Sequence, residues 1–533
     1  MGGMGACGAE DVKVRRRLCR DCACAVWLGR SMLGAGFPRS RVSAPAHAIA
    51  AVQAPLPTTL DVWSAPGATL TISYAFESAQ SGEFLRPYTG WAAWTADEKA
   101  AVRKALDEYE SVINVRFVEV AAGASDPVIA FGRVDVASVA ETWWALWLGP
   151  DAAGQQAIKR WDAGVVFDNS RDLTDPNAQW LILHEIGHAL LMKHTGEYDT
   201  TGKLTPPPHL PAGEDNRDHT VMSYIREDGA AVALQLQVYD IAALQARWGA
   251  NTTEAGGDNV YALGAEAGIV ALWDTGGVDR IDASTATGPA QIDLAEGAFS
   301  QLDGQSRMSI AWGARIEDAT GSAFGDRIAG NALDNRLLGG AGGDTIEGGA
   351  GLNFLRGEEG DDVIVGGAGF DDAHGNMGDD TVHGGAGDDW VVGGKDNDRL
   401  FGDDGHDLVY GNLGDDTAEG GAGNDVVLGG QGNDVVRGGD GDDYVSGDRG
   451  DDVMTGGVGA DSFHSFVGMG RDVVTDFSRA QGDVVQLDAG TAYAVAQVGG
   501  DVVITIGDAG AGESLTLQGI ALAALSGDWI VRL

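Results

Sequence analysis

The sequence is poor in the features that build disulfide-rich, membrane-spanning or nucleic-acid-binding proteins. All four cysteines (Cys7, Cys19, Cys22 and Cys24) fall within the first 24 of 533 residues. The rest of the chain therefore folds without disulfides, which a chain long enough to bury a large core can do. No run of 18 apolar residues occurs, so the sequence predicts no transmembrane helix. Only 35 basic residues stand against 79 acidic ones, and this net charge of −44 disfavours nucleic acid as a partner and favours cations.

The string HEIGHALLMKH at residues 184–194 carries the first chemical signal. His184 and His188 are four residues apart, so on a helix both imidazoles project from the same face and can bind one zinc ion. Glu185 lies on a slightly rotated face, from which its carboxylate can reach a water molecule without binding the metal. His194 follows six residues after His188, so it joins the same metal only if the helix ends between them.

This motif, together with the string TVMSY at residues 220–224, resembles the metzincin zinc endopeptidases, specifically the serralysin branch. The resemblance implies three zinc ligands, His184, His188 and His194, and a general base, Glu185. It also implies a tight turn containing Met222 beneath the site and a displaceable zinc ligand, Tyr224, which takes part in catalysis. The resemblance covers about residues 58–255 and includes the string DIAALQ at residues 240–245.

The chain departs from the family pattern at Leu191, where the family has glycine. Glycine tolerates the backbone conformations that end a helix sharply, whereas leucine at positive φ is strained. We therefore expect either a turn with different dihedral angles or an imperfectly placed His194.

The second signal is a repeat. Residues 339–464 fall into fourteen consecutive nine-residue units, such as GGAGNDVVL, and degenerate units begin at Gly321 and Gly330. The eighth position of each unit is apolar, and the sixth is asparagine only at Asn353. At every other unit the sixth position is an aspartate: Asp344, Asp362, Asp371, Asp380, Asp389, Asp398, Asp407, Asp416, Asp425, Asp434, Asp443, Asp452 and Asp461.

This nonapeptide is typical of calcium-binding parallel β-rolls. Glycines permit tight turns, the sixth-position carboxylates supply oxygen ligands for Ca²⁺, and the last three residues form a short strand with an inward apolar side chain. Residues 321–464 contain 31 acidic and 7 basic residues, so the array repels itself when no cation is bound.

The sequence therefore predicts an α+β metzincin-type protease domain followed by an all-β parallel β-roll. We expect an N-terminal extension or pro-segment at 1–57, the zinc domain at 58–255 and a linking β region at 256–320. The β-roll follows at 321–464, and a β-rich flank with a type I secretion signal follows at 465–533. Within 1–57, the segment Cys22–Leu28 is a marginal signal-peptide core and Met32 is an alternative start.

Within the zinc domain, residues 141–147 are rich in tryptophan, and these rings either line a substrate cleft or pack in the core. Strands are expected at 69–74, 115–120, 128–131 and 163–168, and helices at 95–112 and 238–248.

Two functions are compatible with these signals. The first is a secreted, calcium-stabilised zinc endopeptidase that cleaves proteins or peptides and leaves the cell through a type I exporter, as the resemblance implies. The second is a calcium-binding protein of the cell surface or surface layer, with weak or limited-processing protease activity. The long repeat array and Leu191 are the features that support the second function.

Overall fold

The computed structural model describes most of the chain after residue 68 and a few short segments before it. The described residues are 12–17, 53, 69–80, 84, 87–124, 128–150, 156–196, 208–225, 234–253, 256–265, 268–507 and 512–532. The four cysteines, the marginal signal-peptide core and Met32 lie outside them.

The chain divides into two compact units. The first unit contains Met1–Gly256, Glu266–Gly277 and Ser306–Arg315. The second contains Gly257–Ala265, Val278–Gln305 and Ile316–Leu533. Each unit is described by itself below.

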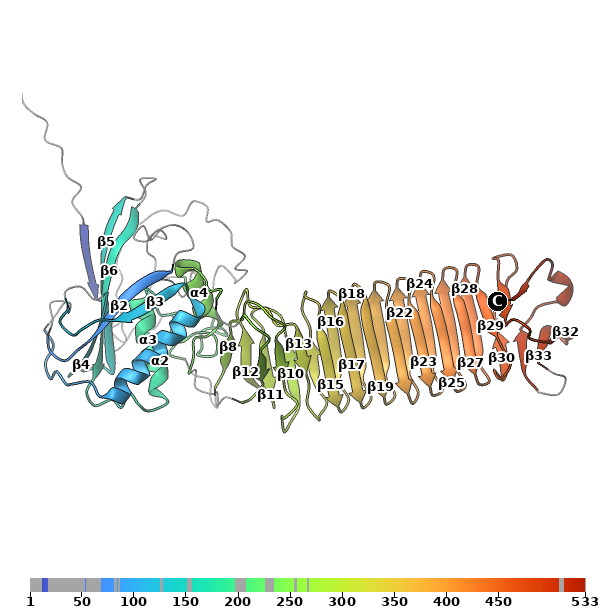
Figure 1. Ribbon diagram of the computed structural model, residues 1–533, viewed down its shortest axis with the longest axis horizontal. Coiled ribbons are helices and arrows are strands. Elements are labelled where there is room, and N and C mark those ends of the chain that lie inside the picture. Colours follow the sequence, from blue (N-terminus) through green and yellow to red (C-terminus); the bar gives the residue numbers. More distant parts are fainter. Residues whose placement is uncertain are drawn as a thin grey trace, which may run out of the picture. The chain divides into compact units, whose positions relative to one another are not determined.

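The first unit is built on a six-stranded mixed sheet with the order β1-β5-β6-β4-β2-β3 (Figure 1). Strands β3, β2, β4 and β6 are parallel, whereas β5 runs antiparallel to β6 and β1 runs antiparallel to β5. The bounds are β1 (Val12–Arg17), β2 (Leu70–Glu77), β3 (Val115–Glu119), β4 (Ile129–Val134), β5 (Ala140–Pro150) and β6 (Gln156–Asp168). All four expected strands are present, and β6 begins seven residues earlier than expected because it continues as a long hairpin partner of β5.

The structure decides between a cleft and the core for two of the three tryptophans at residues 141–147, whereas Trp147 is only partly buried. Trp143 is 3% exposed and Trp144 is 0% exposed, so both pack in the core. Phe84 contacts Trp143 edge-on, with ring centroids 6.1 Å apart. Aromatic burial of this kind anchors the hairpin to the sheet.

Two of the three helices in the described part of this unit lie against each other beside the sheet (Figure 1). Helix α2 (Ala96–Val112) begins where the sequence predicts it, because Thr95 and Glu98 form a capping box. Helix α3 (Ala178–Ala189) is buried over nearly its whole surface, as its apolar sequence requires. Helix α4 (Val238–Trp248) also has the expected bounds. Two short strands, β8 (Val270–Leu272) and β12 (Gln305–Ile310), pair in parallel.

The second unit contains a β-roll in which each coil between residues 318 and 464 takes 18 residues, or two nonapeptides. Ile346 pairs with Ile364 in one sheet, and Leu355 pairs with Ala373 in the other. All fourteen eighth-position side chains are 0% exposed. These stacked apolar side chains form the core of the roll. The parallel pairing of its strands confirms the parallel β-roll prediction (Figure 1).

The strands of the roll are longer than the three residues expected, because the hydrogen-bonded ladder continues through the first glycines of the next unit. One sheet has thirteen strands in the order β35-β31-β29-β27-β25-β23-β21-β19-β17-β15-β13-β9-β7. Their bounds are β7 (Val260–Ala262), β9 (Arg280–Asp282), β13 (Asp318–Thr320), β15 (Arg336–Ala341), β17 (Asn353–Glu359), β19 (Asp371–Met377), β21 (Trp390–Lys395), β23 (Leu408–Leu413), β25 (Val426–Gln431), β27 (Tyr444–Arg449), β29 (Ser462–Ser465), β31 (Val484–Leu487) and β35 (Ile530–Arg532).

The opposite sheet of the roll alternates with the first along the chain. Its strands within the second unit are β10 (Ala290–Asp293), β11 (Phe299–Leu302), β14 (Arg327–Ala329), β16 (Thr345–Ala350), β18 (Val363–Ala368), β20 (Thr381–Ala386), β22 (Arg399–Asp404), β24 (Thr417–Ala422), β26 (Val435–Asp440), β28 (Val453–Val458), β30 (Arg471–Val474), β34 (Ser514–Leu517), β33 (Asp501–Ile506) and β32 (Tyr493–Val498). Strands β32 and β33 run antiparallel to their neighbours and end the parallel ladder. A short 3-10 helix, η1 (Leu522–Ala524), follows β34 in the chain. Among the described residues, no helix is long and apolar enough to cross a membrane.

Candidate metal centres

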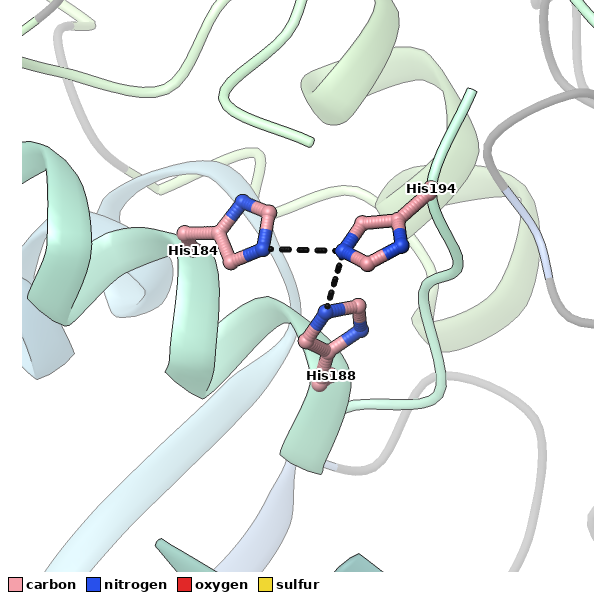
Figure 2. Close-up of side chains that lie close together, drawn as sticks. All are labelled: His184, His188 and His194. Atoms are coloured by element: carbon pink, nitrogen blue, oxygen red, sulfur yellow. Dashed lines mark hydrogen bonds between the residues drawn. The ribbon is translucent and has the colours of Figure 1, made fainter. Parts of the chain in front are cut away.

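Three histidine rings of the first unit meet at one point (Figure 2). His184 and His188 project from α3, and His194 follows after the helix has ended. The Nε2 atom of His194 lies 3.2 Å from Nε2 of His184 and 3.2 Å from Nε2 of His188. All three side chains are 0% exposed. The structure therefore brings together the three histidines that the motif singled out.

The geometry of the rings suits a tetrahedral ion. Zinc–nitrogen bonds of about 2.0–2.1 Å at tetrahedral angles place two ligand nitrogens about 3.3 Å apart, close to the separations observed here. The outer nitrogens of the two helical histidines are already held, since Nδ1 of His184 donates to the Val221 carbonyl at 2.8 Å and Nδ1 of His188 donates to the Met192 carbonyl at 3.0 Å. These bonds fix the tautomer that leaves the Nε2 lone pairs facing the centre.

Burial also keeps the rings in the form that binds a metal. It lowers the pKa of His184 well below the usual value, and the neighbouring His188 lowers it further. The pKa of His194 is lowered for the same reasons. A neutral imidazole is the ligand form, so the donor set fits a zinc ion.

Leu191 shows that both expectations for the helix end were wrong. The residue adopts φ = 71°, the conformation that glycine favours, and its side chain is 0% exposed. His194 is nevertheless in place, as its two 3.2 Å contacts show. The strain of a left-handed leucine, about 1–2 kcal/mol, is offset by burial of its side chain, which is worth about 1.5–3 kcal/mol.

The other residues of the motif surround the three rings. The hydroxyl of Tyr224 lies 2.8 Å from Nε2 of His194. Met222 is 0% exposed and lies beneath α3, where a Cβ added to Gly187 would come within 2.8 Å of its sulfur. Glu185 is also 0% exposed, and its Oε2 accepts a hydrogen bond from the Thr142 hydroxyl at 2.5 Å.

In the second unit, the sixth-position aspartates form two ladders along the roll. One carboxylate oxygen of each accepts a hydrogen bond from a backbone amide one coil earlier. The Asp344 amide, for example, donates to Oδ1 of Asp362 at 2.8 Å, and the Asp416 amide donates to Oδ1 of Asp434 at 2.8 Å. This bond leaves the second carboxylate oxygen, Oδ2, facing the turn.

At all thirteen aspartates this Oδ2 atom is buried without a hydrogen-bond donor. Burial raises the pKa of the carboxyl groups, to about 8 for Asp398 and to about 6 for Asp416, although the amide bonds oppose the shift. A glycine leaves room beside each carboxylate, since a Cβ on Gly357 would lie 2.0 Å from Oδ2 of Asp362. Buried, unsatisfied carboxylate oxygens in a row are a donor set that fits Ca²⁺.

Comparison with known proteins agrees with both centres. The model of the RTX calcium-binding nonapeptide repeat (4 copies) matches overlapping windows at 320–355, 338–373, 374–409, 401–436, 410–445 and 428–463. A serralysin from Proteus mirabilis is 33% identical over 276 residues, which cover 45% of this chain and 55% of the relative. The chain is a homologue of the serralysins.

Further relatives give the same picture. A serralysin from Photorhabdus laumondii is 31% identical and covers 50% of this chain and 60% of its own length. Metallopeptidase AprA from Pseudomonas marginalis is 30% identical, with 50% and 61% covered. The chain thus spans little more than half the length of the serralysins it matches. Among solved structures, an extracellular lipase, LipA from Serratia marcescens, aligns over 40% of each chain at 19% identity and a TM-score of 0.19, a similarity too low to support any conclusion.

Some residues of this serralysin homologue were missed by sequence reasoning. Thr142 reaches Glu185 only because the pairing of β5 with β6 brings it there, and no local motif signals that contact. Asp472 and Asp483 continue the aspartate ladders, because their Oδ1 atoms accept from the amides of Asp452 and Asp461. Two extra residues precede each of these aspartates, so Asp461, Asp472 and Asp483 are eleven residues apart and the period of nine is broken. The apolar residues that follow each aspartate were a usable signal.

Proposed function

We propose that the protein is a secreted zinc endopeptidase whose calcium-loaded β-roll stabilises the chain. The observation that carries this proposal is the convergence of three buried histidine nitrogens, 3.2 Å apart, next to the buried carboxylate of Glu185. The homology with serralysins and metallopeptidases supports the same reaction class.

In this proposal, His184, His188 and His194 hold the zinc through Nε2. When bound, zinc supplies a Lewis acid that polarises a peptide carbonyl and acidifies water. The two backbone carbonyls that accept from Nδ1 of His184 and His188 keep the rings oriented, so little reorganisation accompanies binding.

Glu185 is the proposed general base. Its carboxylate accepts a proton from the attacking water and returns it to the leaving amine. The hydrogen bond from Thr142 holds Oε2 in one orientation, and burial excludes bulk water from the carboxylate. The Tyr224 hydroxyl lies 2.8 Å from Nε2 of His194. We propose that, once it has moved away from the metal, it donates a hydrogen bond to the negative charge that develops on the substrate carbonyl.

The roll is proposed to bind Ca²⁺ through the thirteen sixth-position aspartates. Their Oδ2 atoms accept no hydrogen bond, and hard oxygen ligands favour Ca²⁺ over softer metals. Three parts of this proposal rest on the resemblance to serralysins. They are secretion through a type I exporter, recognition of the C-terminal flank by that exporter, and proteins or peptides as substrates.

The direct test compares the wild-type full-length chain with Glu185→Ala and His184→Ala in casein hydrolysis, with bound zinc measured for each. We expect Glu185→Ala to retain one zinc per chain and lose turnover by a factor of about 10²–10⁴, the contribution of a general base. His184→Ala is expected to lose most of the zinc. Turnover by Glu185→Ala at the wild-type rate would show that another group is the base.

The alternative of a cell-surface calcium-binding protein keeps one supporting observation, the array of fourteen repeats. Its other support was the displaced third ligand expected from Leu191, and His194 lies in contact with the other two histidines. The casein assay separates the two functions, because a surface protein with a weak or vestigial site would bind calcium fully and hydrolyse casein at a small fraction of the rate of an active protease.

A further inference from the structure

Helix α4 carries a buried carboxylate that the proposed reaction does not use. Asp240 is 0% exposed and accepts three hydrogen bonds. The donors are the Thr220 hydroxyl at 2.6 Å, the Val221 amide at 2.8 Å and the Gln237 amide at 2.9 Å. All three donors are neutral groups. They come from two separate segments of the chain, residues 220–221 and the residue before α4.

One of those segments also holds a metal ligand. The Val221 carbonyl accepts two hydrogen bonds, from Nδ1 of His184 at 2.8 Å and from Nε1 of Trp180 at 3.0 Å. The Thr220 hydroxyl, besides donating to Asp240, accepts from the Met222 amide at 3.0 Å. The segment 220–222 is therefore tied to α4 on one side and to α3 on the other.

We propose that Asp240 is a positioning residue for the metal centre, which holds the Val221 carbonyl where it orients His184. The proposal rests on the proposed function only in taking zinc as the ion. The path is short and continuous: the carboxylate of Asp240 binds the amide of Val221, the carbonyl of Val221 binds Nδ1 of His184, and Nε2 of His184 faces the ion. Second-sphere partners of this kind commonly change metal affinity by about 10–100-fold.

The competing explanation is that Asp240 only caps a helix. It is the third residue of α4 and forms a capping box with Gln237, so its loss would weaken the start of the helix in any case. A helix cap changes the stability of the fold, whereas a positioning residue also changes the geometry and affinity of the metal site. The two roles are therefore separable by measuring the ion rather than the activity.

The chain offers matched variants for this separation. Asp240→Asn keeps the shape of the side chain but has one acceptor oxygen and an NH₂ group facing three donors. Thr220→Val removes one of the three donors, and Thr220→Ser restores the hydroxyl. Thr95→Ala removes the N-cap side chain of α2, whose hydroxyl accepts from the Glu98 amide at 3.2 Å, and serves as the control for a lost helix cap.

The experiment uses the full-length chain in calcium, with zinc and Co²⁺ as probes. Zinc dissociation constants are measured by competition with a chromophoric chelator, and the visible spectrum of the Co²⁺-loaded chain reports the ligand geometry. We expect Asp240→Asn to raise the zinc dissociation constant about 10–100-fold and to shift the Co²⁺ spectrum. We expect a smaller effect in the same direction for Thr220→Val, wild-type values for Thr220→Ser, and a wild-type dissociation constant with a lower melting temperature for Thr95→Ala.

Wild-type zinc affinity and an unchanged Co²⁺ spectrum in Asp240→Asn would reduce Asp240 to a helix cap and overturn the proposal. If Asp240→Asn does not fold, Thr220→Val decides: wild-type affinity in that variant overturns the proposal in the same way. Failure of the proposed function looks different, because a wild-type chain that binds zinc without cleaving casein leaves these affinity measurements intact.

Discussion

The two units offer donor sets for metal ions that are built in opposite ways. In the first unit, one site is assembled from residues that a helix, a turn and a distant loop bring together, and the outer nitrogens of His184 and His188 are bound to backbone carbonyls. In the roll, one arrangement is repeated at thirteen aspartates, and each leaves a buried carboxylate oxygen without a donor. A site satisfied by its own protein forms before the ion arrives, whereas a site with an unsatisfied charge forms with the ion.

Calcium removal tests this contrast most strongly. Each unsatisfied buried polar group costs about 1–3 kcal/mol, and more when charged. Thirteen of them therefore reach the roughly 5–15 kcal/mol that stabilises a whole domain. We expect the full-length chain to lose most of the β-structure of the roll in calcium-free buffer and to regain it on titration with millimolar Ca²⁺, followed by far-UV circular dichroism. Mg²⁺ should substitute poorly, because it demands a tighter octahedral shell.

The first unit supplies the internal control for that titration, since α2, α3 and α4 should retain their helical signal without calcium. A spectrum that does not change when calcium is removed would refute the contrast between the units.

Acid should partly replace calcium, which gives the second prediction. Burial raises the pKa of the sixth-position aspartates, for example to about 6 for Asp371 and to about 8 for Asp398, against about 3.9 in an unfolded chain. The folded roll then binds more protons than the unfolded chain, so its calcium-free stability is greatest below about pH 4 and falls as pH rises through about 7.

We therefore expect the calcium-free chain to gain β-structure when the pH is lowered from 8 to about 4.5, and the calcium-loaded chain to bind Ca²⁺ more weakly over the same change, because protons compete for the same oxygens. Circular dichroism and isothermal titration calorimetry measure the two effects. A calcium-free roll with more structure at pH 8 than at pH 4.5 would contradict the assigned burial of these carboxyl groups.

The third prediction concerns the one repeat unit with asparagine at the sixth position, where a protein hydrogen bond takes the place of an ion, as in the first unit. Asn353 stands where the other units have aspartate, and its Nδ2 donates to Oδ1 of Asp371 at 2.7 Å. The side-chain amide of Asn353 thus gives Oδ1 of Asp371 a hydrogen-bond donor without an ion. Asn353→Asp replaces this donor with a carboxylate, so we expect one additional Ca²⁺ per chain, counted by native mass spectrometry. Asp389→Asn, on the same ladder, should lose one; an unchanged count in both variants would show that these residues do not set the number of ions.

The smallest expected effect lies in the turn between the zinc helix and His194. Leu191→Gly loses a buried side chain but relieves a left-handed backbone, whereas Leu190→Gly loses a buried side chain at φ = −89° and relieves nothing. We expect Leu191→Gly to destabilise the zinc-loaded chain by about 1–2 kcal/mol less than Leu190→Gly, measured as the difference in their melting temperatures. Equal losses would mean that Leu191 is not strained.

Local periodicity predicted much of this architecture. The spacing of His184 and His188 predicted that two of the three converging histidines share one helix face. The period of nine predicted the roll, its buried eighth positions and its rows of aspartates. These features depend on neighbours along the chain or on an exact repeat, which is why a sequence alone reveals them. The start of α2 was predicted for the same reason, since Thr95 and Glu98 cap it locally.

The contacts that join distant segments could not be predicted in this way. Thr142 and Asp240 act through strand pairing and helix packing, so no spacing relates them to the residues they bind. At Leu191 the local rule led to a wrong prediction. The rule disfavours leucine at positive φ, but burial of the leucine side chain outweighs that preference.

The 18-residue coil constrains how such a gene can change in length. Adding or removing 18 codons inserts or deletes one whole coil, because residue 346 would then stack on the equivalent of residue 364 as before. Adding nine codons would move every later strand to the opposite sheet, and the closing strands β32 to β34 would then meet the wrong ladder. Recombination between repeats is therefore expected to leave arrays that differ by even numbers of nonapeptides.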